Sequence, residues 1–169
     1  VSKSQTKKIK NLNTILLQLS KYVEVHVIDD HNYGPVYSVL SVLDKIPNEP
    51  FIINYCDFLV QWNYSKLKRL IADFDLVIPT FTGFHPANFG TTLFAYINSD
   101  KFGNLIELRE KESFTSNKKN ELASTGTYYF RDKNIFNKYA NEVVNDRDRV
   151  LPEAYVSLLA NPMVRDGLK

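Results

Sequence analysis

The sequence predicts an α/β protein with a mainly parallel, mixed sheet flanked by helices and a β-rich excursion in its second half. In the first half, helical and strand patterns alternate along the chain, as they do in proteins with parallel sheets. In the second half, short β-prone segments follow one another with turns between them. The 169 residues are 44% apolar and 24% charged, which is ordinary for a folded protein with a sizeable core. We therefore expect a single Rossmann-like domain over residues 1–169.

The first half of the chain supplies the alternating elements. Leu12, Leu16 and Leu19 recur at helical spacing, which indicates an amphipathic helix. Pro35 suits the first turn of a later helix, where its missing N–H would have no partner in any case. The expected elements are a helix over about residues 5–20, a strand over 23–28, a helix from 35 to near 47, a strand over 51–55, a helix around 67–71 and a strand over 75–82.

The second half of the chain supplies the β-rich part. Its apolar and aromatic runs predict strands over residues 92–97, 105–109 and 125–130. Residues 100–104 have the composition of a hairpin-type connection, and residues 113–120 that of a polar loop. Two final helices are expected, one over about residues 135–143 and one from 152 through 158.

Composition and charge narrow the classes of partner. The net charge is +2, from 21 basic and 19 acidic side chains, so nothing favours nucleic acid or an acidic membrane surface as a partner. Cys56 is the single cysteine, which excludes an internal disulfide and suits a reducing compartment. Residues 1–10 lack the pattern of a signal peptide, and no apolar run approaches the length of a membrane span. We expect a cytoplasmic protein.

Asp57 is the first candidate for chemistry. The apolar run over residues 51–55 ends two residues before this carboxylate. In open α/β sheets, ligands bind at the carboxyl ends of strands. Mg²⁺ is commonly held by one or two carboxylates together with phosphate oxygens and water. Asp57 therefore suits a metal ligand, and equally suits the cap of the next helix.

Two more candidates lie at the end of a predicted strand and at the start of a predicted helix. Glu110 and Lys111 close one strand and open a polar loop, where Lys111 could hold a phosphate as a point charge. A surface ion pair is the more common role of such a dipeptide. Gly34 precedes the helix that begins at Pro35, and a glycine there would allow a ligand close to the backbone. An ordinary loop glycine is the simpler interpretation.

The last candidates are Thr125 and Gly126, in a small polar segment that leads into an aromatic strand. Backbone amides and the Thr125 hydroxyl could line a sugar pocket. The alternative is the start of a strand with a bulge at Gly126.

Taken in order, these segments resemble the sugar-phosphate nucleotidyltransferase family, the nucleotide-sugar pyrophosphorylases. The agreement in order and spacing extends over roughly residues 23–160. The matching segments are Gly34-Pro35-Val36-Tyr37-Ser38-Val39-Leu40, Tyr55-Cys56-Asp57, Phe102-Gly103-Asn104 with Glu110-Lys111, Thr125-Gly126-Thr127-Tyr128-Tyr129-Phe130 and, loosely, Leu151-Pro152-Glu153.

The resemblance implies an activity and a role for each candidate. The family joins a nucleoside triphosphate to a sugar phosphate and releases pyrophosphate, so both substrates are the expected partners and Mg²⁺ the expected cofactor. By resemblance, Asp57 binds Mg²⁺ and Lys111 meets the sugar phosphate, as the catalytic pair. The same comparison gives substrate-binding roles to Gly34 at the nucleotide and to Glu110, Thr125 and Gly126 at the sugar.

The sequence departs from the family pattern in three places. Cys56 replaces a glycine, no glycine-rich loop with Arg and Lys precedes Gly34, and the second metal-binding Asp would lie beyond Lys169. We therefore expect a partial domain whose own activity is open. The residues that follow Gly34, together with Cys56, resemble those of a bacterial branch of this family that is linked to capsule or surface polysaccharide synthesis.

Three functions remain open after this comparison. The chain is expected to belong to a nucleotidyltransferase, or to be a non-catalytic module of the same fold for nucleotide-sugar binding or dimerisation. A glycosyltransferase of related fold is a third candidate, against which the Glu110-Lys111 and Thr125-Gly126 segments argue. The sequence does not determine whether the chain forms a homo-oligomer.

Overall fold

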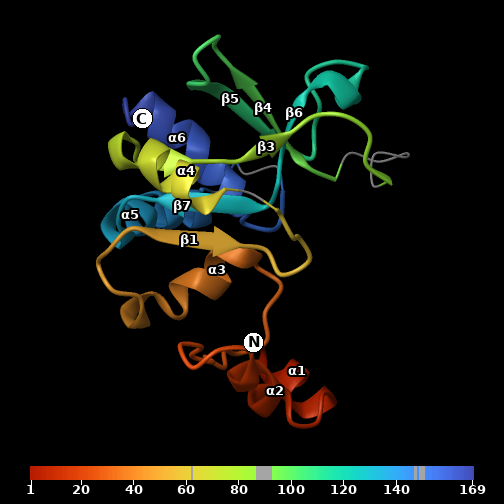
Figure 1. Cartoon of the computed structure of the whole chain (residues 1–169), viewed down its shortest axis with the longest axis vertical. Helices are drawn as coiled ribbons and strands as arrows, with labels where there is room; N and C mark the ends of the chain where they lie inside the picture. The colour runs from red at the N-terminus through yellow and green to blue at the C-terminus, as the bar shows by residue number, and fades with distance from the viewer. Residues whose placement is uncertain (62, 87–92, 147, 149–150) are drawn as a thin grey trace.

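The structure is a computed structural model that describes residues 1–61, 63–86, 93–146, 148 and 151–169. Its helices and strands form a helical N-terminal part, a helix-covered central sheet and a second sheet beyond it (Figure 1). Across these described residues, no helix has the length and apolar character needed to cross a membrane.

The N-terminal part holds two short helices where one was expected. α1 (Lys3–Lys8) and α2 (Leu12–Leu19) are separated at Asn11, whose φ of 62° is left-handed and ends the helical path. Neither helix buries a residue, and both lie at one end of the molecule, beyond α3 and away from the two sheets (Figure 1). The strand expected over residues 23–28 is absent there. In its place an isolated parallel bridge joins Ile28 to Ser2.

Among the described residues, the central sheet has three strands in the order β1-β7-β2, namely β1 (Phe51–Asn54), β7 (Thr127–Phe130) and β2 (Leu76–Val77). β7 runs antiparallel to both neighbours. The prediction of a mainly parallel Rossmann-like sheet is therefore wrong, although the mixture of helices and strands is confirmed. The cause is β7, which comes from the second half of the chain and lies between the two first-half strands in the opposite direction.

Helices cover both faces of this sheet, so β7 is buried throughout. Tyr128 and Phe130 point into the main core, and Tyr129 packs on the other face against Leu67 and Ile71. The covering elements are α3 (Pro35–Leu40), α5 (Lys133–Asn145), the 3-10 turn η5 (Val156–Leu159) and α6 (Ala160–Arg165) on the first face, with α4 (Tyr64–Leu70) on the second.

The second sheet has the order β3-β6-β4-β5, with every adjacent pair antiparallel. Its strands are β3 (Thr80–Phe81), β6 (Leu122–Ser124), β4 (Ala95–Ser99) and β5 (Leu105–Glu110). The strand expected over 75–82 divides between the two sheets as β2 and β3, whereas the strand expected over 125–130 begins at Thr127 as β7, just after β6 of the other sheet ends at Ser124. The chain passes from one sheet to the other at Pro79 and again at Thr125. Thr125 N donates to Pro79 O over 3.0 Å, so these two connecting segments lie side by side. The strand expected over 92–97 begins later, and residue 92 lies outside the described residues.

The remaining elements adjust the expected boundaries. The helix expected from Pro35 to near 47 ends at Leu40, and a 3-10 turn, η1 (Leu43–Lys45), follows it. α5 begins earlier than expected because the Asp132 side chain caps it, accepting hydrogen bonds from two backbone N–H groups. The helix expected over 152–158 begins later, as η5 and α6, and short 3-10 turns η2 (Ile71–Asp73) and η4 (Lys118–Asn120) complete the described elements.

Candidate functional site

Lys111 lies where β5 ends, with a backbone conformation unusual for a residue that has a side chain. Its φ is 58°, and its N–H donates to Phe94 O over 3.0 Å, which fixes the turn against β4. A left-handed non-glycine residue costs roughly 1–3 kcal/mol, and such residues concentrate at functional sites. The side chain is exposed, so the strained turn presents an ammonium group to solvent.

Glu110 precedes it on β5 and points to the interior. The Ser157 hydroxyl donates to its Oε2 atom. Burial raises the pKa of the Glu110 carboxyl, and the Ser157 hydrogen bond and the charge of Lys111 oppose that rise. Tyr128 lies nearby, and burial raises the pKa of its phenol to about 12. The Glu110 carboxylate thus faces hydroxyl groups, as a carboxylate that binds sugar hydroxyls would.

A five-residue segment over 153–157 connects the predicted site positions. It lies just before and at the start of η5, and each of four consecutive residues in it contacts a different partner. Along the segment, Ala154 packs against Gly34, Tyr155 accepts from Lys111, Val156 N donates to the Tyr55 hydroxyl over 3.2 Å, and Ser157 donates to Glu110.

Lys111 ends a short polar chain on this segment. Its ammonium donates to the Tyr155 hydroxyl, which in turn donates to a carboxylate oxygen of Glu153. The Nζ atom lies 4.3 Å from the centroid of the Tyr155 ring. The hydrogen bond to Tyr155 raises the pKa of Lys111, helped by the charges of Glu153 and Glu110 and opposed by partial burial. The lysine therefore stays charged.

Gly34 has a structural reason to be glycine. Its φ is +96°, and a Cβ atom there would lie 2.6 Å from Ala154 N and 2.8 Å from Ala154 O. Two backbone hydrogen bonds fasten the contact, from Val36 N to Ala154 O at 3.0 Å and from Ala154 N to Tyr33 O at 2.8 Å. The close approach of the 153–157 segment explains this residue without a ligand, and its role at a nucleotide stays a prediction.

Thr125 and Gly126 lie where the chain crosses between the two sheets. Thr125 is buried, and its hydroxyl donates to Pro79 O over 3.1 Å. Gly126 has a φ of +72°, and a Cβ atom there would lie 2.9 Å from the Phe58 ring. Gly126 O also accepts from Tyr55 N over 2.9 Å. The crossing therefore packs against the loop that carries Asp57.

Asp57 lies in the turn after β1 and is exposed. Within the described part of the chain its carboxylate makes no hydrogen bond or ion pair. The alternative that it caps the next helix is wrong, because the Asn63 side chain caps α4 by accepting from Lys66 N over 3.0 Å. Neighbouring Cys56 is a free, exposed thiol.

The donor set around Asp57 decides how a magnesium ion would fit. Among the described residues, no group of three His, Cys, Asp or Glu side chains could hold a metal alone. A single free carboxylate nevertheless suits Mg²⁺ when phosphate oxygens of a substrate and water complete the shell. The residues present therefore fit an ion that arrives with phosphates.

The structure brings some of the predicted residues together and leaves others apart. Gly34, Glu110 and Lys111 meet on the 153–157 segment. Thr125, Gly126 and Asp57 belong to a neighbouring pair of loops, and the contacts of the described residues do not join Asp57 to Lys111. Sequence reasoning missed Tyr155 and Ser157, because nothing in their local pattern indicates contact with a strand end more than forty residues earlier.

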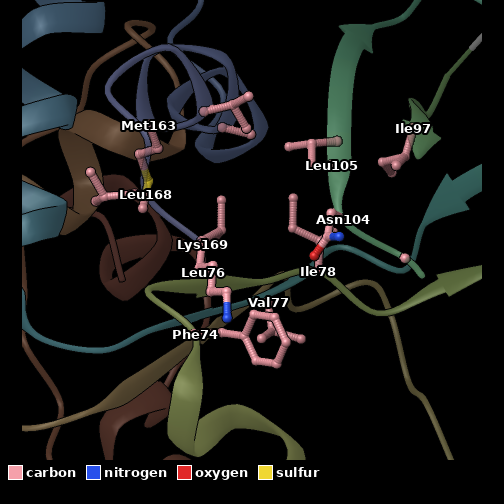
Figure 2. A pocket seen from close by; sticks show the side chains of 13 residues that line it. Phe74, Leu76, Val77, Ile78, Ile97, Asn104, Leu105, Met163, Leu168 and Lys169 are labelled. Atoms are coloured by element: carbon pink, nitrogen blue, oxygen red, sulfur yellow. The ribbon is translucent and has the colours of Figure 1, made fainter. Parts of the chain in front are cut away.

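A cavity of about 330 Å³ lies elsewhere, between α6, β2 and the β4–β5 hairpin. Figure 2 shows apolar side chains facing it, with Met163 and Leu168 opposite Leu105 and Ile78. None of the predicted site residues lines it, so it does not belong to the candidate site.

Comparison with known proteins relates the fold to other chains. No family model matches the sequence, and no curated protein matches it. Among solved structures, a nucleoside-diphosphate-sugar pyrophosphorylase from Vibrio cholerae RC9 aligns with a TM-score of 0.68 at 16% identity, covering 95% of this chain and 66% of its own. A protein named as a glucose-1-phosphate thymidylyltransferase, from Bacillus anthracis and bound to sucrose, gives 0.64 at 14% identity, with 93% and 61% covered.

HddC from Yersinia pseudotuberculosis gives a TM-score of 0.58 at 16% identity, with 92% of this chain and 61% of that one covered. A second structure of HddC, complexed with GMP-PN, gives 0.53 at 16% identity, with 90% and 60% covered. The chain thus spans slightly less than two thirds of these proteins. The resemblance expected from motif order is confirmed at the level of the fold, which this chain shares with sugar nucleotidyltransferases.

Proposed function

We propose that the chain has the site of a sugar-phosphate nucleotidyltransferase, with the sugar phosphate bound at the corner after β5 and the nucleotide at Gly34. Such an enzyme transfers a nucleotidyl group from a nucleoside triphosphate to a sugar phosphate, giving a nucleotide sugar and pyrophosphate. The fold shared with named sugar nucleotidyltransferases supports this reaction class. The observation that carries the proposal is the corner after β5, where an exposed lysine in a strained turn follows a half-buried glutamate.

In this proposal Lys111 binds the phosphate of the sugar substrate. Its ammonium, kept charged by its neighbours, neutralises the phosphate and holds one oxygen in line with the α-phosphorus of the nucleotide. A bond forms between that oxygen and the α-phosphorus. The bond from the α-phosphorus to the leaving pyrophosphate breaks, and its electron pair leaves with the pyrophosphate.

The other residues bind and orient. Glu110 accepts hydrogen bonds from sugar hydroxyls through the oxygen that Ser157 does not occupy. Thr125 and Gly126 form the wall beside the sugar. The Thr125 hydroxyl donates its proton to Pro79 O, so this residue contacts the sugar by packing and does not donate a hydrogen bond to it. Gly34 lies at the nucleotide. Asp57 is the residue that would hold Mg²⁺, and the bound ion supplies charge neutralisation at the reacting phosphates.

The biological setting is also part of the proposal. We place the reaction in the cytoplasm, with the nucleotide sugar serving capsule or surface polysaccharide synthesis. The residue pattern of the segments at Gly34 and Cys56 supports the link to polysaccharide synthesis.

The test is pyrophosphate release from pairs of nucleoside triphosphates and sugar 1-phosphates, with and without Mg²⁺. We expect release with at least one pair, abolished by Lys111→Met or Asp57→Asn. Lys101→Met is a matched control, because Lys101 is another exposed lysine lying over an aromatic ring, 5.0 Å from the Phe102 centroid. Asp44→Asn removes an exposed carboxylate elsewhere. Nucleotide-sugar binding without any pyrophosphate release would instead support a non-catalytic module.

A further inference from the structure

Tyr155 and Glu153 place a polar chain next to Lys111 that the proposed reaction does not use. The Tyr155 hydroxyl has one proton, which it donates to the Glu153 carboxylate. Its lone pairs are then directed to a donor, and the Lys111 ammonium supplies one. Glu153 thus determines that the hydroxyl accepts from the lysine.

We infer that Tyr155 is a positioning residue for Lys111, with Glu153 setting the orientation of its hydroxyl. This inference rests on the proposed role of Lys111 at the sugar phosphate. An ammonium group has three N–H donors, so the bond to Tyr155 leaves two for a phosphate. Lysine has a flexible four-carbon stem, and holding its end in advance lowers the entropy lost when a ligand binds.

Tyr155 can position Lys111 only if its own backbone is held in place. The residues on both sides of it are held by the rest of the molecule. Ala154 is bonded to the turn at Gly34, and Val156 N is bonded to the Tyr55 hydroxyl at 3.2 Å. The backbone at Tyr155 is therefore held in place on both sides. Its ring centroid lies 4.3 Å from Lys111 Nζ, so a fixed ring also fixes the position of the ammonium group. Lys101 lacks such an arrangement, because the ring beneath it belongs to Phe102, which has no hydroxyl.

The test measures the ionisation of Lys111 by NMR in the ligand-free chain, with lysine labelled at Cε. Tyr155→Phe keeps the ring and removes only the hydroxyl. We expect the pKa of Lys111 to fall toward its ordinary value, since the Tyr155 hydrogen bond is the largest cause of its rise, leaving Glu153 and Glu110 as the acidic groups that face it. Tyr22→Phe, at an exposed tyrosine of the N-terminal part, is the control and leaves this pKa unchanged.

The second readout is the affinity for glucose 1-phosphate, with inorganic phosphate as a smaller probe. Loss of the preorganisation of one long side chain predicts a roughly two- to tenfold weaker affinity in Tyr155→Phe. Glu153→Gln provides an independent variant with the same expected direction for the pKa of Lys111, should Tyr155→Phe fold poorly. An unmoved Lys111 pKa in the folded variants overturns the positioning contact.

The readouts separate this inference from the proposed function. If Lys111→Met abolishes glucose 1-phosphate binding while Tyr155→Phe leaves it intact, the positioning role is wrong and the phosphate role of Lys111 stands. If Lys111→Met changes nothing, the phosphate role is wrong and the positioning role falls with it. A pKa and an affinity that both fall in Tyr155→Phe support the inference.

Discussion

Replacing Gly34 by alanine tests the contact that joins the 153–157 segment to the start of α3. The new Cβ atom would lie 2.6 Å from Ala154 N and 2.8 Å from Ala154 O, both backbone atoms that cannot rotate away. The residue would also keep a φ of 96° and a ψ of 174°, a region adopted almost only by glycine.

The two effects give the expected magnitude. Backbone strain of this kind costs about 1–3 kcal/mol. Overpacking of a filled site costs about another 1–3 kcal/mol, so the loss of unfolding free energy is about 2–6 kcal/mol. For a protein of this size, each kcal/mol lowers the midpoint of thermal unfolding by roughly 2–4 °C, which predicts a fall of roughly 4–24 °C.

Gly103→Ala is the matched control. Gly103 has a φ of +86°, but nothing lies within 4 Å of the position where its Cβ atom would be. It therefore reports backbone strain without the clash. Differential scanning calorimetry of both variants should show the larger loss in Gly34→Ala, by about 1–3 kcal/mol. An equal or smaller loss in Gly34→Ala would refute the account of this contact.

Three further outcomes follow from the structure. Gly126→Ala should lower the thermal midpoint less than Gly34→Ala, because its Cβ meets the Phe58 side chain at 2.9 Å, and a ring can move where backbone cannot; an equal loss would contradict this. Asp132→Ala removes the cap of α5 and should cost about 1 kcal/mol in urea unfolding, whereas an unchanged midpoint would show the cap to be dispensable. Hydrogen bonds from Lys138, Arg165 and Tyr139 lower the pKa of Asp166 to about 2. The ionised Asp166 carboxylate therefore stabilises the folded state above pH 4, and this contribution is lost as the pH falls toward 2. Asp166→Asn should flatten the pH dependence of stability in that window, and an unchanged slope would exclude this contribution.

The local elements of the fold could be read from the sequence, while the direction of strand pairing could not. The apolar run at 51–55 and the helical pattern over about 135–143 are local signals, and both elements form. The position of β7 between β1 and β2 depends on contacts between residues about fifty to eighty positions apart. Alternation of helices and strands contains no information about a strand inserted from the other half of the chain.

The candidate site divides in the same way. Glu110 and Lys111 were recognisable from their place at a strand end, and their position there holds. The partners that fix them, Tyr155 and Ser157, come from a distant segment whose residue types alone indicate nothing. For Gly34 the sequence suggested a ligand or a simple loop. The structure gives a third reason, a backbone contact with Ala154.

The central claim is that the corner at Lys111 binds a sugar phosphate, and a thermal-shift titration of this chain tests it most directly. Ligands are sugar 1-phosphates and nucleoside triphosphates, alone and together, with and without Mg²⁺. A ligand at one hundred times its Kd stabilises the folded state by about 2.7 kcal/mol. At roughly 2–4 °C per kcal/mol this is a rise of roughly 5–11 °C. The account predicts such a rise with a sugar 1-phosphate, lost in Lys111→Met and kept in Lys101→Met. A rise that survives Lys111→Met unchanged would contradict it.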